Sequence, residues 1–227
     1  MISHKNIDYI WDITTGYSTL SGKYKTFVQF NFIKDCLDDK KNLNILDIGG
    51  GSGRFALPLS KNHSVMVIDP NKEALSILRQ RDKTMKLRLI NKTFEEYDLQ
   101  EKFDFILLIE TMQYFANIRE ILKKVYIMLN DDGSVIFSIL NKTSIKYLLR
   151  KFKPHTNYPD IRSYRGYKKI IHETGFKILN VEGYNWIPFK VNSNCFFVNV
   201  FTWLEFRMYL RNIPHLSPEL MFWIKKR

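Results

Sequence analysis

The chain has 227 residues, of which 45% are apolar and 26% charged, with a net charge of +12. These values are typical of one globular domain, and no internal repeat, low-complexity tract or apolar run of about 18 residues indicates a solenoid, a disordered tail or a membrane span. Cys36 and Cys195 are isolated and have no histidine at metal spacing, so we expect neither a disulfide framework nor a bound metal. Residues 1–6 lead into no apolar signal region, and we expect a cytoplasmic protein.

An apolar run at 43–48 leads directly into a glycine-rich loop. Such runs form buried parallel strands, and ligands of open α/β folds bind at the carboxyl ends of these strands. Glycines permit positive φ and let main-chain atoms approach a ligand closely. The loop has Arg54 where the dinucleotide pattern G-x-G-x-x-G requires its third glycine. It satisfies D-x-G-x-G-x-G in full, with Asp47, Gly49, Gly51 and Gly53.

This motif resembles the first motif of the class I S-adenosylmethionine-dependent methyltransferases. The resemblance implies an α/β fold: a single doubly wound Rossmann-like domain, with helices on both faces of a seven-stranded, mostly parallel sheet that has an antiparallel strand near its end. It also implies S-adenosyl-L-methionine as the cofactor, bound by Asp47 and by the loop glycines, including Gly50. A glycine-rich turn without a ligand is the alternative for the motif alone.

The next apolar run, at 65–68, ends in Asp69 and Pro70. These residues come about twenty positions after the first glycine, where an acidic side chain can accept hydrogen bonds from ribose hydroxyls. We therefore expect Asp69 and Pro70 to contact the cofactor. A simple helix cap is the alternative for Asp69, because Pro70 and Asn71 begin a predicted helix.

The rest of the chain continues the alternation of strands and helices that is typical of a doubly wound sheet. Strands are expected at 87–90, 103–109, 135–138, 176–182 and 220–224, and helices at 117–129 and 162–174. Asp131, Asp132 and Gly133 should end the first of these helices. We divide the single domain, 1–227, into an N-terminal helical cap (1–42), a cofactor-binding core (43–140) and substrate-side elements (141–227).

By the same resemblance, the loop after the third strand contacts the adenine. Thr93 and Phe94 occupy the matching positions, and Ile109 lies at the end of the fourth strand. Many relatives have an Asp in this loop, but Asn91, Lys92 and Thr93 stand at its expected place. We expect backbone groups and Phe94 to bind the adenine instead. Ordinary core packing is the alternative for Phe94.

Methyl transfer from a sulfonium mainly requires that a nucleophile be held in line with the methyl carbon and that water be excluded. A hydroxyl acceptor also benefits from a base. Tyr114 and His155 are the candidate catalytic residues near the expected site mouth, with Glu110 as a third candidate. The alternatives are packing for Tyr114 and a plain exposed loop position for His155.

Positive charge is concentrated at 141–190, which contain 11 Lys and Arg but 3 Asp and Glu. A basic face implies an anionic partner, which is a phosphorylated or carboxylated substrate, an anionic membrane surface or nucleic acid. A solvated surface without a partner is the alternative.

Aromatic residues crowd a helical stretch before the last strand: Phe196, Phe197, Phe201, Trp203, Phe206 and Tyr209. A narrow polar stripe accompanies them: Asn199, Thr202, Glu205 and Asn212. Packing on the sheet is the simplest interpretation, and a substrate cap, a dimer face and a helix in a membrane interface are alternatives. The resemblance suggests that N-terminal aromatics supply the other half of a cap: Tyr9, Trp11, Tyr17 and Tyr24.

These features predict an S-adenosylmethionine-dependent methyltransferase that methylates an O, N or C atom of a small or lipid-linked anionic metabolite, such as a glycan intermediate. Peripheral membrane contact stays open. An RNA methyltransferase is the runner-up, but residues 109–112 lack the Asn-Pro-Pro-Tyr type of signature that base amino methylation uses, so nucleic acid is a less favoured partner. A non-catalytic protein that docks a partner or a membrane through the aromatic helix is the alternative of a different class.

Overall fold

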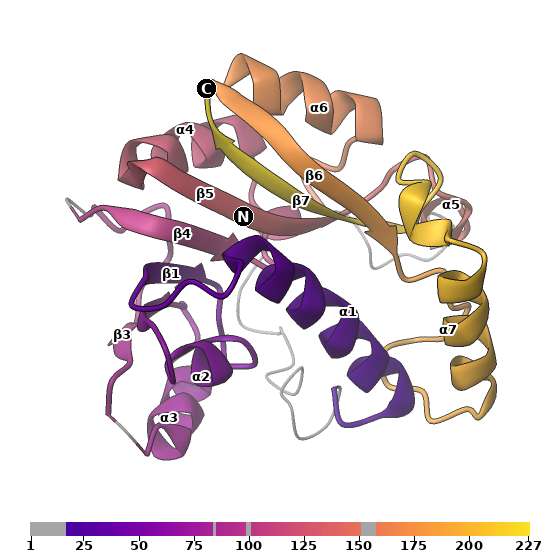
Figure 1. Ribbon diagram of the computed structural model, residues 1–227, viewed down its shortest axis with the longest axis horizontal. Helices are drawn as coiled ribbons and strands as arrows, with labels where there is room; N and C mark the ends of the chain where they lie inside the picture. The colour runs from indigo at the N-terminus through magenta and orange to yellow at the C-terminus, as the bar shows by residue number, and fades with distance from the viewer. Residues whose placement is uncertain (1–16, 84, 99–100, 151–157) are drawn as a thin grey trace.

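The computed structural model describes residues 17–83, 85–98, 101–150 and 158–227 (Figure 1). Its strands form one sheet in the order β3-β2-β1-β4-β5-β7-β6. The strands are β1 (Asn44–Ile48), β2 (Ser64–Ile68), β3 (Arg88–Ile90), β4 (Phe103–Leu108), β5 (Leu129–Leu140), β6 (Phe176–Tyr184) and β7 (Glu219–Lys226). Strands β1 to β5 pair in parallel, and β7 is antiparallel to both β5 and β6. The predicted seven-stranded, mostly parallel sheet with an antiparallel strand near its end is confirmed.

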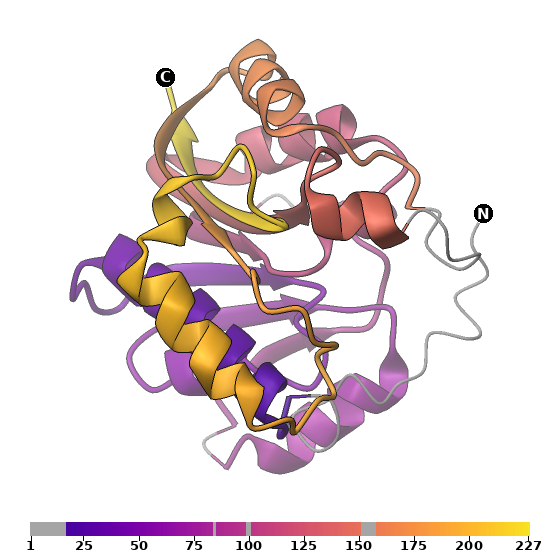
Figure 2. The same ribbon diagram turned by 90° about the vertical axis from the view of Figure 1, so that its right-hand side faces the viewer.

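Helices cover both faces of this sheet (Figures 1 and 2). They are α1 (Leu20–Leu37), α2 (Ala56–Leu59), α3 (Lys72–Arg81), α4 (Ile118–Met128), α5 (Ile145–Arg150), α6 (Tyr164–Glu173) and α7 (Phe197–Arg207), with short 3-10 turns η2 (Met112–Tyr114) and η3 (Leu210–Asn212). Buried side chains of α4 and α6 pack on one face, and those of α1, α2 and α3 pack on the other. Within the described ranges, none of the helices has the length and apolar character needed to span a bilayer.

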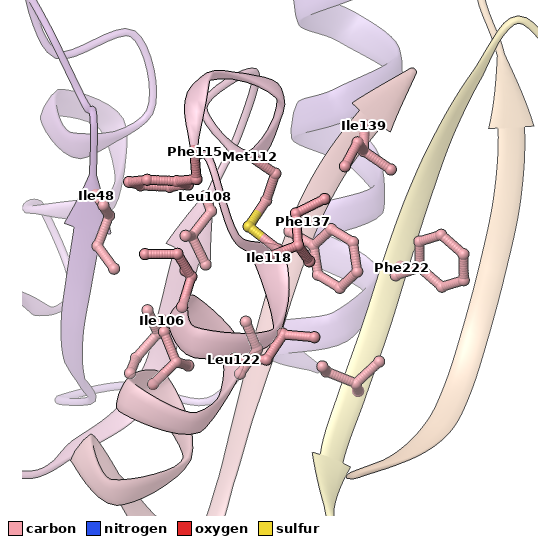
Figure 3. Close-up of a cluster of buried hydrophobic side chains, with 14 of the residues drawn as sticks. Ile48, Ile106, Leu108, Met112, Phe115, Ile118, Leu122, Phe137, Ile139 and Phe222 are labelled. Carbon is pink, nitrogen blue, oxygen red and sulfur yellow. The ribbon is translucent and has the colours of Figure 1, made fainter. Parts of the chain in front are cut away.

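The central strands are buried on both faces, because alternate side chains enter different core layers. In β1, Ile48 belongs to the layer under α4, whereas Ile45 belongs to the layer under α1. Figure 3 shows the layer under α4, where Ile48 and Leu108 of the sheet lie close to Ile118 and Leu122 of α4. This two-sided burial explains the near-continuous apolar runs seen in the sequence.

Helices α1, α3, α4 and α6 begin at short polar side chains that cap them. Asn71 Oδ1 accepts hydrogen bonds from the backbone N of Glu73 (3.1 Å) and of Ala74 (3.0 Å) at the start of α3. Asn117 caps α4 in the same way, and Ser163 caps α6. Such caps satisfy the backbone donors that a first helical turn leaves free. The predicted helix starts near Asn71 and Asn117 are confirmed.

The predicted turn after α4 is wrong, although the helix ends at Met128, within one residue of its predicted end. Strand β5 begins at Leu129 and includes Asp131–Gly133, which were expected to form a turn before the strand. Phe103 pairs with Leu129 but Phe105 pairs with Ser134, so the turn residues form an irregularity within the strand. Gly133 is required there, because a Cβ would lie 2.9 Å from the carbonyl oxygens of both Asn130 and Phe103. Pairing with β4 therefore extends past residues that locally favour a turn.

The expectation that the aromatic helix packs on the sheet is also wrong. Helix α7 lies on the outer side of α1 (Figure 2), and its buried side chains are those of Val198 and Glu205. Glu205 is 0% exposed and accepts hydrogen bonds from the Tyr24 hydroxyl (2.6 Å) and the Trp186 backbone N (3.0 Å). Because a buried carboxylate needs such donors, part of the polar stripe faces inward and the aromatic side chains face solvent.

Candidate active site

The strand order reverses between β1 and β4, since β1 continues to β2 on one side and β4 to β5 on the other. Loops diverge at such a switch point and leave a crevice at the carboxyl edge of the sheet, where ligands bind. The glycine loop follows β1, Asp69 follows β2, and Ile109 follows β4. The sheet therefore brings the predicted cofactor residues to one edge.

The glycines of the loop serve two different purposes. Gly49, Gly51 and Gly53 all have positive φ, of 73°, 51° and 88°. A Cβ at Gly49 would lie 2.4 Å from Thr111 Oγ1, and one at Gly53 would lie 2.2 Å from a methyl carbon of Leu78. At Gly51 the nearest atom would be an Asp69 carboxylate oxygen at 3.9 Å. Gly49 and Gly53 are thus needed for close packing, whereas Gly51 presents an open backbone.

Gly50 lies directly over the acidic residue of the motif, because a Cβ there would lie 2.6 Å from Asp47 Oδ2. Asp47 is 2% exposed, and this Oδ2 has no hydrogen-bond partner among the described residues. Burial raises the pKa of Asp47 to about 7, against an opposing effect of Arg54. A buried acceptor without a donor, next to an open glycine loop, fits a ligand that brings N–H donors or positive charge.

Asp69 is fixed beside Gly51 by hydrogen bonds to its carboxylate. Oδ2 accepts from the backbone N of Gly51 (2.8 Å), and Oδ1 accepts from the backbone N of Asn71 (2.8 Å). Burial raises the pKa of Asp69, and these two hydrogen bonds oppose that rise. Each carboxylate oxygen can accept a further hydrogen bond, so the side chain remains able to bind ribose hydroxyls.

Asn91 supports this corner of the site and was not predicted to do so. Its Nδ2 donates to the carbonyl oxygens of Asp69 (3.1 Å) and Pro70 (3.0 Å), which ties the loop after β3 to the loop after β2. The sequence signal was its place in the loop where an Asp is common in relatives. The residues at this edge fit S-adenosylmethionine, which Asp47, Gly51 and Asp69 would hold.

The expected adenine-side residues lie at the same edge with different exposures. Phe94 is 3% exposed and packs edge-on against Phe115, with ring centroids 6.3 Å apart, as its core-packing alternative required. Thr93 Oγ1 accepts from the backbone N of Glu96 (3.4 Å), and Ile109 is buried. Contact of these three predicted residues with the cofactor stays a prediction.

Glu110, directly after β4, is the centre of a charged cluster. Its backbone has φ of 60°, a left-handed value that is uncommon for a residue other than glycine and is found at functional sites. Its carboxylate accepts from Gln29 Nε2 (3.0 Å), lies 3.4 Å from Arg54 Nη2, and contacts the Tyr17 hydroxyl and the Lys25 ammonium. Glu110 therefore joins the N-terminal segment and the glycine loop to β4.

Of the partners of Glu110, Tyr17 was expected in a substrate cap, whereas the others were not predicted as site residues. Lys25 and Gln29 are one turn apart on α1, a polar pair on the side of the helix that also buries Val28 and Phe32. Arg54 lies over the ring of Tyr17, with its guanidinium carbon 3.8 Å from the ring centroid. A polar pair at i and i+4 among apolar positions was the one available signal.

Of the two candidate catalytic residues, only Tyr114 lies within the described residues. Its ring packs edge-on against Tyr158, with centroids 5.6 Å apart. Desolvation, together with Tyr158 and Glu110, raises the pKa of the Tyr114 phenol. The hydroxyl therefore stays protonated near neutral pH, which suits a hydrogen-bond donor better than a base. His155, like the cap aromatics Tyr9 and Trp11, lies outside the described residues.

The raised pKa of Asp47 predicts a pH dependence of stability. Between about pH 4, near the pKa of an unfolded Asp, and about pH 7, the folded state holds a proton that the unfolded state has lost. The free energy of unfolding therefore falls as the pH rises through this window. An Asp47→Asn variant lacks that fall, so urea unfolding should show it gaining about 3 kcal/mol over the wild type across the window. If the difference in free energy of unfolding between Asp47→Asn and the wild type did not change with pH, the raised pKa of Asp47 would be contradicted.

The strand order and the loops after β1, β2 and β4 together define a class I S-adenosylmethionine-dependent methyltransferase. A family model described as a methyltransferase domain matches residues 18–181, and the chain belongs to this methyltransferase family.

Relatives agree with this assignment. A ubiquinone biosynthesis O-methyltransferase from Rickettsia prowazekii is 30% identical over 120 residues, which cover 51% of this chain and 47% of the relative. A protein of the same name from Pelagibacter ubique is 28% identical over 165 residues, 65% of this chain and 69% of the relative. The chain spans about half the length of most of the curated relatives it matches. A solved structure from Listeria monocytogenes, assigned as an S-adenosylmethionine-dependent methyltransferase, has a TM-score of 0.68 at 18% identity and covers 90% of this chain and 99% of its own.

Proposed function

We propose that this protein transfers a methyl group from S-adenosylmethionine to an oxygen atom of a small or lipid-linked anionic acceptor. The observation that carries the proposal is the open backbone of Gly51 beside the fixed carboxylate of Asp69. The names of the Rickettsia and Pelagibacter relatives support oxygen as the acceptor atom. The cofactor supplies a methyl group activated on a sulfonium, so the protein's task is to hold the acceptor and exclude water.

The acceptor side of the site is proposed to lie where the basic connection after β5 meets the end of β4. The ring contact between Tyr114 and Tyr158 joins these two segments. Lys142 is exposed just beyond β5, and its backbone N donates to the carbonyl oxygen of Arg162 (3.0 Å). This backbone bond fixes the start of the basic connection near the carboxyl edge, where the exposed Lys142 supports an acceptor with negative charge.

Not every cation of the basic segment is available to an acceptor. Lys146 Nζ donates to the carbonyl oxygens of Asn185 (3.1 Å) and Ile187 (2.8 Å), so its ammonium ties α5 to the segment after β6. Arg162 forms an ion pair with Asp160 (2.8 Å). Lys142 is thus the better choice for a test of acceptor charge.

A Lys142→Ala variant should raise KM about fivefold for anionic hydroxylated acceptors and leave kcat and cofactor affinity unchanged, because an exposed cation contributes modestly to binding. The assay measures S-adenosylhomocysteine release with carboxylated and phosphorylated hydroxy compounds, each beside a neutral analogue. Lys177→Ala, which removes an exposed lysine on β6, is the matched control. A preference for neutral or cationic acceptors, or turnover only with RNA, would contradict the proposed acceptor class.

A further inference from the structure

The outer side of α7 carries an exposed aromatic face that neither the cofactor site nor the proposed acceptor site uses. The face consists of Phe196, Phe197, Phe201, Trp203, Phe206 and Tyr209, with Phe27 of α1. Phe196, Trp203 and Tyr209 are 72%, 61% and 67% exposed. The rings of Phe27 and Phe206 lie edge-on, with centroids 6.3 Å apart, so the face continues from α7 onto α1. Contiguous apolar surface of this kind marks an interaction site.

Most exposed ionisable groups around the aromatic face are cationic. Residues 17–34 and 186–218 contain one acidic residue, Glu205, which is 0% exposed, and Asp35 is exposed further along α1. Lys23, Lys190 and Arg207 are exposed on the same two segments. The guanidinium carbon of Arg211 lies 5.3 Å from the centroid of the Phe206 ring, and this guanidinium is paired with Glu182. Aromatic side chains bordered by Lys and Arg, without an exposed carboxylate on these two segments, match the interface of a bilayer that contains anionic lipids.

We propose that the aromatic face docks the protein on the surface of an anionic lipid bilayer. This docking surface extends the proposed function. It rests on that function only for the identity of the acceptor. Helix α1 links the two sites: Lys25 and Gln29 contact Glu110 on its inner side, whereas Phe27 is exposed on its outer side. Docking would therefore hold one wall of the active site close to the bilayer, where a lipid-linked acceptor resides.

A second copy of the chain is the competing occupant of the aromatic face. In a symmetric dimer the same surface would meet itself. Lys23, Lys190 and Arg207 of the two copies would then lie near one another, with no exposed carboxylate on these segments to offset them. This charge pattern favours the bilayer over self-association.

Vesicle sedimentation of the full chain tests the proposal. Wild-type protein should bind vesicles of phosphatidylcholine mixed with phosphatidylglycerol about tenfold better than vesicles of phosphatidylcholine alone, and added salt should weaken this binding. The double variant Phe197→Ser with Trp203→Ser should lose about tenfold, and Arg207→Glu should lose binding only to the anionic vesicles. Ile127→Ser, which removes a 68%-exposed apolar side chain from α4, is the matched control and should bind as the wild type does.

Calorimetric binding of S-adenosylmethionine, measured on every variant, reports that the fold and the cofactor site are intact. Equal vesicle binding by the double variant and the wild type, or no binding by the wild type, would overturn the proposal. Sedimentation velocity could instead show a wild-type dimer that does not bind vesicles and that is lost in the double variant. That result would assign the face to a second copy. Vesicle binding without methyl transfer to any anionic acceptor would contradict the proposed function but support the docking surface.

Discussion

A Gly51→Val substitution is expected to lower the affinity for S-adenosylmethionine about 100-fold, or about 2.7 kcal/mol. Gly51 has φ of 51°, which a β-branched residue adopts only with strain. The space at its Cβ position is open, so the new side chain would project where a ligand must approach the backbone rather than into the core. We therefore expect the fold to survive while cofactor binding fails. Calorimetric titration measures the first effect, and circular dichroism the second.

Gly175→Val is the control that separates the effect of backbone strain from the effect of blocking the ligand. Gly175 also has positive φ, of 88°, but it follows α6 and contacts Tyr126, away from the glycine loop. The control should lower the melting temperature and leave cofactor affinity within about twofold of the wild type. If Gly51→Val retained full affinity, the backbone at Gly51 could not be part of the cofactor site.

A Glu110→Ala substitution is expected to lower the free energy of unfolding by about 3 kcal/mol, because it removes one carboxylate from two partly buried cations and leaves Lys25 with Glu219 alone (3.0 Å). The side chains of Lys25 and Arg54 are 14% and 12% exposed, so water replaces the lost partner poorly. For a domain of this size the melting temperature should fall by about 6 to 12 °C. Turnover should fall as well, because Glu110 holds α1, the glycine loop and the end of β4 together. Urea unfolding and an S-adenosylhomocysteine release assay measure the two effects.

Glu101→Ala is the matched control for the loss of an ion pair. Glu101 pairs with Arg88 at 2.7 Å, but both side chains are about half exposed, and the loss should be within about 0.5 kcal/mol. Glu110→Gln, which keeps an acceptor for Gln29 and Tyr17, should fall between Glu110→Ala and the wild type. Equal stability of Glu110→Ala and Glu101→Ala would show that the Glu110 cluster is not a structural centre.

The position of the predicted cofactor residues at one edge of the sheet could be predicted from the sequence because its signals are local. Asp47, the loop glycines and Asp69 each lie at the end of an apolar strand, and parallel strands bring such ends to one edge. Asn91, in contrast, acts through bonds to carbonyl oxygens 21 and 22 residues away. No local pattern indicates bonds of that kind.

The orientation of α7 was mispredicted for a similar reason. Its aromatic residues suggest burial when the helix is considered alone. Glu205 determines which side of α7 packs against the rest of the protein. It accepts hydrogen bonds from Tyr24 of α1 and from Trp186 in the segment after β6. The cluster around Glu110 also depends on α1 docking beside β4, which joins residues 81 and more positions apart. Sequence periodicity describes an element's two sides but not which of them the fold buries.

Calorimetric titration with S-adenosylmethionine and S-adenosylhomocysteine, on the wild type and on Asp69→Ala, tests the central claim most directly. The carboxylate of Asp69 is held between Gly51 and Asn71, at the predicted ribose position, so the wild type should bind both ligands with micromolar affinity and the variant about 30-fold more weakly. Glu73→Ala, four residues further on, should bind as the wild type does. A folded wild-type protein that binds neither ligand, or an Asp69→Ala variant with unchanged affinity, would contradict the account.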